Sequence, residues 1–259
     1  MLATTPLFLI SFLKEIQIGN FDFSLTASWP RKMDVESKRE TMSIKVKAPD
    51  SLVLKRYAEM LKGSTRRIFG VRYGKILDLV EIEVQSEVLS VIAQFYDPSV
   101  RSFLFKDFQL APTLEEYEHI LGRPLIDGSP YLYQCNLPSW GRITKLLRVL
   151  EMELIKRKQQ RSGIEGIPLS YLEEKMHFLL EIREWDNLID VLGLAMYGII
   201  LLPHLNDYID LEAINAFLAT WERGSSSVVV VLENTYYSLQ RCHDGRGRRL
   251  TCCMPALYL

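Results

Sequence analysis

The stretch YDPSVRSFLFKDFQLAPTLEEYEHILGRP, from Tyr96 to Pro124, carries the densest set of mutually consistent local signals in the chain. In its first half, Arg101 to Leu110 alternates between apolar and polar residues, which is typical of extended structure. Lys106-Asp107 lies between two aromatic arms and predicts a two-residue turn, although the glycine that such turns favour is absent. The sequence therefore predicts one small β-hairpin near residues 101–111.

The second half of this stretch predicts a capped helix. Thr113 and Glu116 form a T-x-x-E capping box, in which each side chain bonds to the backbone N–H of the other residue. Gly122 and then Pro124 supply the end of the helix. The apolar residues at helical spacing are Leu114, Tyr117, Ile120 and Leu121. One short hairpin thus leads into one helix, and both present an apolar face to something larger.

Apolar residues at helical spacing recur through most of the chain. The other predicted helical segments are Ser51 to Lys62, the residues after Tyr73 and after Ser86, Trp140 to Gln160, Pro168 to Ile182, Trp185 to Leu202, Asp210 onward and the second half of Ser225 to Gln240. Val228 to Val231 favours a strand by propensity, which makes the start of that last segment ambiguous. Arg66-Arg67 is expected in a loop. The predicted fold is mainly α, a single irregular multi-helix bundle with one small hairpin.

The segment from Trp185 to Leu202 is the most hydrophobic of these helices. It is apolar almost all round from Val191 onward, which is typical of the centre of a bundle. Gly193 and Gly198 remove side chains and would let neighbouring helices approach closely. The apolar run Val191 to Pro203 is too short to cross a bilayer, so we expect no membrane segment.

The sequence also suggests a division of the chain. Residues 1–50 look irregular and charge-rich, and we interpret them as a variable, partly disordered arm. An apolar run in this arm, Pro6 to Leu13, lacks the basic flank and the cleavage site of a signal peptide, so a docking helix or a gene-model artefact is favoured. Residues 51–259 form the predicted helical domain. The chain stops inside MPALYL, the start of another helix, which indicates a truncated domain.

The composition of the chain bears on its function class and its cellular compartment. The chain has 31 Lys and Arg against 32 Asp and Glu, and a net charge of -1 argues against a dedicated duplex-DNA binder. Its 4 cysteines do not make a disulfide framework, which favours a reducing compartment such as the nucleus or the cytoplasm.

The ionisable residues do not form a recognisable catalytic pattern. Pyridoxal chemistry would need a lysine beside a phosphate-binding loop, and no such loop accompanies Lys75, Lys145 or Lys175. A transposase nuclease would need carboxylates that converge on a strand-rich sheet. The candidate carboxylates lack that succession of strands: Asp107, Asp186, Asp190, Asp207 and Asp210. We interpret Asp186 and Asp190 as capping or solvated residues, and we expect no catalytic residues and no cofactor.

One cluster has metal-ligand character. It consists of Cys242, His243, Cys252 and Cys253. Zinc sites commonly use C-x2-4-C spacing, and adjacent ligands fit poorly on one tetrahedron. Small buried thiols and a surface histidine are therefore favoured, and we expect no stoichiometric zinc. His119, His177 and His204 have no Cys or Ser partner that the sequence identifies.

Two groups of cations are the candidate nucleic-acid contacts. The first is Lys156, Arg157, Lys158 and Arg161, and the second is Arg246, Arg248 and Arg249. Either group could contact phosphates. The competing interpretation is a solvated helix end, where cations complement the helix dipole. That interpretation is the one we favour.

Several segments of the chain are similar to a known family. They are RYGKILDLVEIEV, AQFYDPSVRSFLFKDFQLAPTLEEYEHILGRPL, GIPLSYLEEK, LAMYGIILLPHLNDYIDLEAINAFL and NTYYSLQRCHDGRGRRLTCCMPALYL. Together they resemble the plant mobile domain, also called the aminotransferase-like plant mobile domain, and its legume-rich branch of unknown function in particular. The resemblance covers roughly Tyr73 to Leu259, with a weaker continuation back to Ser51.

The resemblance implies a mainly helical domain that transposable elements have spread through plant genomes. Free-standing members of that family are nuclear and are linked to gene silencing and genome stability, and no catalytic residues can be transferred from it. The leading hypothesis is therefore a non-enzymatic nuclear module that binds other proteins. The alternative is a nucleic-acid-binding accessory domain of a transposon product.

Overall fold

The computed structural model describes residues 43–125, 129–132, 140–161, 163–205, 207–245 and 249–259. Almost all of them belong to one compact unit, Ile44–Tyr258, and the second unit comprises Met1–Ser43 and Leu259. The compact unit begins before residue 51, the boundary expected from the sequence. The apolar run Pro6 to Leu13 lies outside the described residues.

The centre of the compact unit is helix α10, Trp185–Met196, as the sequence predicted. Its residues Val191, Leu192 and Leu194 have no exposed surface. The helix continues directly into a π-helical turn, η3, Tyr197–Leu201, which is also buried throughout. Because this segment is apolar on every face, it is stable only when other elements cover it all round.

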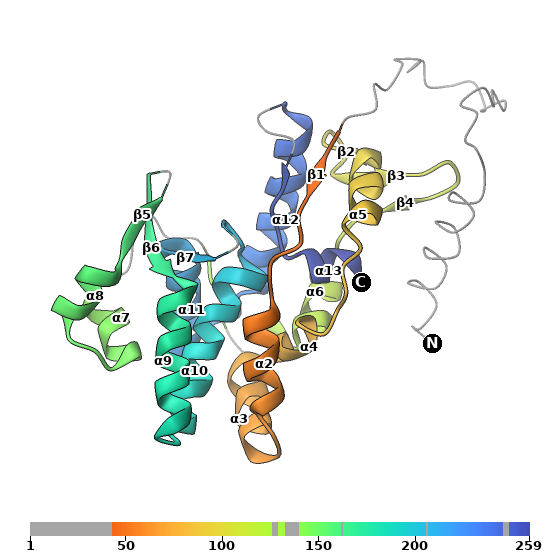
Figure 1. Ribbon diagram of the computed structural model, residues 1–259. Helices are drawn as coiled ribbons and strands as arrows, with labels where there is room; N and C mark the ends of the chain where they lie inside the picture. Colours follow the sequence, from red (N-terminus) through yellow and green to blue (C-terminus); the bar gives the residue numbers. More distant parts are fainter. Residues whose placement is uncertain (1–42, 126–128, 133–139, 162, 206, 246–248) are drawn as a thin grey trace. The chain divides into compact units, whose positions relative to one another are not determined.

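Within the described residues, five helices pack against α10, of which α9 is its neighbour in sequence and α2 and α3 come from much earlier in the chain (Figure 1). They are α2 (Leu52–Met60), α3 (Ser64–Tyr73), α7 (Trp140–Leu147), α9 (Leu169–Glu181) and α11 (Leu211–Arg223). Helix α11 is capped by Asp210, whose Oδ1 accepts a hydrogen bond of 2.8 Å from the backbone N–H of Ala213. The prediction of a mainly α, multi-helix bundle is confirmed.

The predicted hairpin is present with its predicted turn. Strand β3 (Ser102–Leu104) pairs antiparallel with β4 (Gln109–Leu110), with Phe103 opposite Leu110. The N–H of Phe105 donates to the carbonyl of Phe108 at 3.0 Å, which closes a turn at Lys106-Asp107. A further strand, β2 (Tyr96–Asp97), pairs with the other edge of β3. The hairpin is therefore two strands of a three-stranded sheet.

The capping box at the start of helix α6 (Leu114–Leu121) is confirmed. The N–H of Glu116 donates to Thr113 Oγ1 at 3.2 Å, and the N–H of Thr113 donates to Glu116 Oε2 at 3.0 Å. Gly122 ends the helix in the left-handed conformation with φ 62°. Tyr117 is buried and its hydroxyl lies 3.0 Å from Thr235 Oγ1 on α12 (Val228–His243), which anchors α6 to that helix.

Replacing Thr113 by alanine should lower the free energy of unfolding by about 1 kcal/mol, because the N–H of Glu116 loses its acceptor. The matched variant is Glu115→Ala in the same first turn, whose side chain is exposed and forms no part of the box. It removes an interaction with the helix dipole and should cost a few tenths of a kcal/mol. Urea unfolding of both variants measures the difference, and equal losses would contradict the role of the box.

Two more small sheets were not predicted from the sequence. Strands β5 (Gln159–Arg161), β6 (Ile164–Pro168) and β7 (Tyr208–Asp210) form an antiparallel sheet in that order. Strands β1 (Lys45–Val46) and β8 (Arg249–Leu250) form a parallel pair. Strands this short carry too few residues to show an alternating pattern in sequence.

The remaining elements complete the unit. They are α4 (Ile76–Leu79), α5 (Ser86–Ile92), the 3-10 turn η1 (Ala93–Phe95), α8 (Glu151–Arg157) and α13 (Met254–Tyr258). Arg66-Arg67, expected in a loop, lies in α3, and Val228 to Val231 is helical in α12. Ile182, the residue after the end of α9, is 50% exposed.

Candidate functional site

A polar centre between α3, α10 and α11 gathers around Asp190. Its Oδ1 accepts hydrogen bonds from Arg72 Nη1 at 2.9 Å and from the Tyr73 hydroxyl at 2.7 Å. Its Oδ2 accepts from Trp221 Nε1 at 2.9 Å. The Asp190 side chain is 14% exposed, whereas Asp186, which also pairs with Arg72, is 69% exposed. The interpretation of Asp190 as a solvated residue is therefore wrong, and its role is to join three helices.

Burial keeps the hydroxyl of Tyr73 protonated in this centre. Burial raises the pKa of Tyr73, and the negative charge of Asp190 raises it further. Tyr73 thus keeps its proton and remains a donor to the carboxylate. Since both oxygens of Asp190 are occupied by donors from the chain itself, the centre stabilises the fold.

Two other groups considered for catalysis also have structural partners. Lys175 Nζ lies 2.7 Å from Glu153 Oε1, and the Tyr171 hydroxyl donates to the same oxygen at 2.9 Å. These contacts lower the pKa of Glu153 and link α8 to α9. Asp210 is buried as the cap of α11, and desolvation raises its pKa.

The three cysteines among the described residues lie in the core. Cys242, Cys252 and Cys253 have no exposed surface. Desolvation raises the pKa of Cys242 to about 11 and that of Cys253 to about 12, so both thiols are neutral near pH 7. The ring of His243 contacts the carbonyl of Ala93 at 2.9 Å. Within the described part of the chain, no three His, Cys, Asp or Glu side chains lie together as a metal-binding group.

The first predicted group of cations is largely paired with carboxylates. Arg157 lies 3.0 Å from Glu174, and Lys158 lies 3.0 Å from Glu165. Both Asp207 oxygens accept from Arg161 Nη1 at 2.9 Å. Lys156 is exposed in the last turn of α8. Three of the four cations are therefore paired with a carboxylate of the chain, and this group offers little unpaired positive charge to a phosphate backbone.

The second group leads to a different surface, the outer face of the β1–β8 pair. Arg246 and Arg248 lie outside the described residues, and Arg249 is the first residue of β8. The parallel register sets Lys45 directly opposite Arg249 and Val46 opposite Leu250, which is fully buried. Lys45 and Arg249 therefore share the outer face, and Lys47, the first residue after β1, lines the same small hollow as Arg249. We call these three residues the basic ladder.

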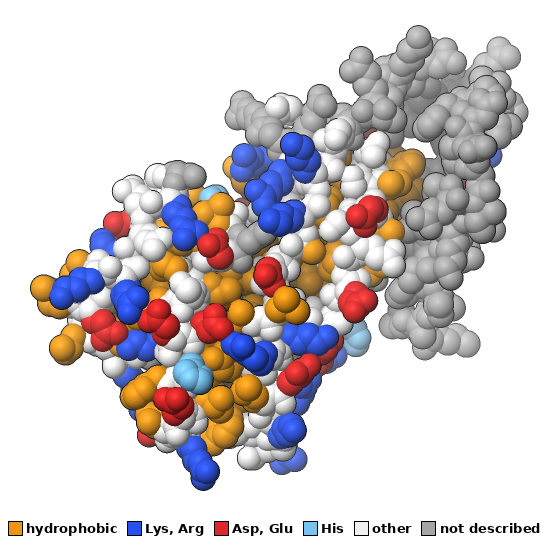
Figure 2. All heavy atoms as spheres, in the orientation of Figure 1, with side chains coloured by type: hydrophobic (Ala, Val, Ile, Leu, Met, Phe, Trp, Pro, Cys, Tyr) orange, Lys and Arg blue, Asp and Glu red, His pale blue; other side chains and the backbone are white. Residues whose placement is uncertain are grey.

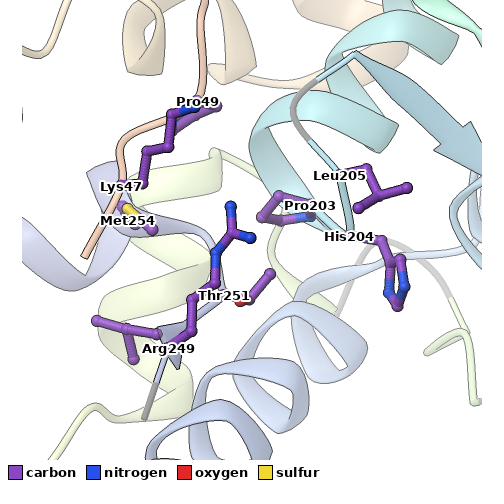
Figure 3. A pocket seen from close by; sticks show the side chains of 9 residues that line it. Lys47, Pro49, Pro203, His204, Leu205, Arg249, Thr251 and Met254 are labelled. Carbon is purple, nitrogen blue, oxygen red and sulfur yellow. The ribbon is translucent and has the colours of Figure 1, made fainter. Parts of the chain in front are cut away.

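A small hollow adjoins the basic ladder. Its lining includes Lys47, Arg249, Pro203 and His204, and its volume is about 10 Å³, room for one water-sized group. In Figure 3 the guanidinium of Arg249 lies between Lys47 and Pro203. Figure 2 shows Lys and Arg side chains gathered over the region of β1. The hollow is too small to enclose a substrate, so any ligand of the ladder lies along the surface.

A larger cavity opens between α7, α9 and the start of α10, and we call it the α9 pocket. Its volume is about 150 Å³, and its lining residues are Leu147, Arg148, Lys175, Phe178, Leu179, Ile182, Glu184 and Asn187. Phe178 and Ile182, one helical turn apart, are 53% and 50% exposed. Asn187 is 4% exposed, and its Nδ2 has no hydrogen-bond partner among the described residues.

Sequence reasoning missed both surfaces in part. Lys45 and Lys47 belong to the segment interpreted as an arm, and nothing local links them to Arg249 at the other end of the chain. Phe178 lies in the predicted helical segment Pro168 to Ile182, and nothing in that segment marked it as part of a surface site.

The structure thus defines a mainly α-helical domain with three small sheets among its described residues. None of the helices in those ranges combines the length and the apolar character that crossing a bilayer requires. The chain belongs to DUF7745, a domain family of unknown function, whose model matches residues 54–259. No curated protein and no solved structure matches the chain.

Proposed function

We propose that this domain is a non-enzymatic module that binds other proteins in the nucleus, and that it derives from, or is carried by, a plant transposable element. The origin and the nuclear location are supported by the resemblance to the plant mobile domain described above. The observation that carries the binding function is the α9 pocket, because two exposed apolar side chains, Phe178 and Ile182, line a cavity there.

The size and chemistry of the α9 pocket favour an apolar anchor from a partner protein. A cavity of about 150 Å³ holds roughly one benzene-sized group, which is the size of an aromatic or branched side chain. Burying Phe178 and Ile182 under such a partner removes apolar surface from water. Interfaces commonly derive most of their binding energy from a few anchors of this kind.

Asn187 adds a polar contact at the bottom of this site. A buried donor without an acceptor costs about 1–3 kcal/mol. A backbone carbonyl of the bound segment that accepts from Asn187 Nδ2 would recover that cost. Charged residues at the rim are already paired, since Arg148 lies 3.6 Å from Glu184 and Lys175 pairs with Glu153. The partner segment is thus expected to be apolar at its centre.

The test is a comparison of proteins retained from nuclease-treated plant nuclear extract by the wild type, Phe178→Asp and Val71→Asp. Val71 is the matched control, because it is 75% exposed on α3 and does not line the pocket. We expect the wild type and Val71→Asp to retain the same proteins and Phe178→Asp to lose them. Identical retention by all three, or retention that requires intact nucleic acid, would contradict the proposal. Matching circular dichroism spectra would establish that the variants fold.

The second candidate function is a nucleic-acid-binding accessory domain of a transposon product. One observation favours it, the basic ladder, whose cations have no carboxylate partner among the described residues. The net charge of -1 is consistent with a local contact surface and not with a dedicated duplex-DNA binder.

A further inference from the structure

The basic ladder places like charges against each other without compensation from the described residues. Lys45 and Arg249 are directly opposite on neighbouring strands, and Lys47, one residue past the end of β1, lines the same hollow as Arg249. All three are exposed. Like charges in opposite positions of a sheet repel and destabilise the pairing. An anion on this face would remove that repulsion.

Acidic side chains of the described residues do not neutralise the ladder. Ten lysines and arginines of the described residues form salt bridges with Asp or Glu, and none of them belongs to the ladder: Lys55, Arg56, Arg66, Arg72, Arg142, Arg148, Arg157, Lys158, Arg161 and Lys175. Among the described residues that line the adjoining hollow, His204 has an acidic neighbour: its Nδ1 lies 3.9 Å from Asp210 Oδ2. The positive charge of the ladder is therefore available to a ligand.

The geometry favours an extended polyanion. The three cations follow one another along the surface, since Lys45 is opposite Arg249 and Arg249 shares a hollow with Lys47. The adjoining hollow admits a water-sized group only, so a free nucleotide could not be enclosed. The large exposed apolar side chains of the described residues include none from the ladder or the lining of its hollow, which disfavours an acidic peptide with apolar anchors.

We infer that the outer face of the β1–β8 pair binds the phosphate backbone of nucleic acid, with Lys45, Lys47 and Arg249 each contacting a phosphate oxygen. This inference rests on the second candidate function and is independent of the α9 pocket. Contacts of this type position a nucleic acid without reading its sequence. Binding should consequently depend strongly on salt and weakly on base sequence.

The experiment uses the full chain and a short mixed-sequence DNA duplex, with affinity measured by fluorescence anisotropy between about 50 and about 200 mM salt. The triple variant K45Q/K47Q/R249Q removes the ladder. K62Q/K106Q/K145Q is the control with the same change in net charge, at exposed lysines outside the ladder. Since each phosphate contact contributes about 0.9 to the slope of log affinity against log salt, the ladder variant should lose about 2–3 units of slope and the control about none.

The outcomes separate the inference from the function on which it rests. No measurable affinity of the wild type for the duplex overturns both. Salt-dependent binding that the ladder variant retains in full overturns the inference and leaves the second candidate function standing. Equally tight binding of a polyglutamate peptide with the same dependence on the ladder also overturns it, because the ligand would then be an acidic protein. If the triple variant does not fold, K47Q should lose about 0.9 of slope and R249K none, and equal behaviour of these two counts against the inference.

Discussion

Replacing Asp190 by alanine is expected to lower the free energy of unfolding by about 3–5 kcal/mol, the loss typical of breaking a buried charged pair. The side chain is 14% exposed and accepts from three donors, Arg72, Tyr73 and Trp221. Its removal leaves the Tyr73 hydroxyl and the Trp221 N–H without their acceptor and adds a cavity between α3, α10 and α11. The effect is large because the donors cannot turn to water without separating the helices.

Asp186 offers a matched control for this prediction on the same helix and with the same partner. Asp186 Oδ1 lies 2.8 Å from Arg72 Nη2, but its side chain is 69% exposed. Solvent-exposed ion pairs contribute about 1 kcal/mol or less, so Asp186→Ala should have a small effect. Asp190→Asn should lose less than Asp190→Ala, because the amide oxygen still accepts on one side while the amide nitrogen cannot accept on the other. Urea unfolding of the three variants measures the ranking, and equal losses for Asp186→Ala and Asp190→Ala would refute the role assigned to Asp190.

The elements predicted well are those whose stabilising contacts are local in sequence. The capping box joins Thr113 to Glu116, three residues apart, and the hairpin turn is closed between Phe105 and Phe108. Residue types and spacing suffice to predict contacts over such distances. The central helix was predicted because its hydrophobicity on all faces is a property of the segment alone.

The features that were missed depend on contacts between distant residues. The hydrogen bond from Arg72 to Asp190 spans 118 residues, and the strand pair β1–β8 joins the two ends of the compact unit. Neither contact produces a local sequence pattern. A two-residue strand is too short to show a period, and a single aspartate in a helix is compatible with several structural roles. The cation groups show the same limit, since Arg161 and its partner Asp207 are 46 residues apart. Pairing of charges, which decides whether a basic run can bind phosphate, was therefore beyond the sequence.

The two candidate surfaces are formed by different elements of the domain. The α9 pocket is formed by α7, α9 and α10, whereas the basic ladder is formed by β1 and β8. Loss of one surface by mutation should therefore leave the other unchanged, since substitutions at distant, independent sites add. This independence lets protein binding and nucleic-acid binding be assigned with single-surface variants of one intact chain.

Adding a methyl group at Gly198, where the sequence indicated a close approach, is expected to destabilise the domain. A Cβ at this position would lie 2.6 Å from Ile209 Cγ1 and Cγ2, closer than carbon atoms approach in folded proteins. Ile209 has no exposed surface and is held in β7, so it cannot move into solvent. Gly198→Ala should therefore destabilise the domain by about 1–3 kcal/mol through overpacking. The close neighbour is thus a strand and not the helix that the sequence suggested.

At Gly70 the same replacement by alanine is expected to raise the free energy of unfolding. It lies in α3 and is exposed, and a Cβ added there would meet no atom within 4 Å. Gly70→Ala should therefore stabilise the domain by up to about 1 kcal/mol through helix propensity.

A double variant isolates the contact between residue 198 and Ile209. Ile209→Ala alone should cost about 2–5 kcal/mol, but together with Gly198→Ala the loss should be smaller than the sum, because the truncated side chain makes room for the new methyl group. Strictly additive losses in urea unfolding would contradict the contact between residue 198 and Ile209.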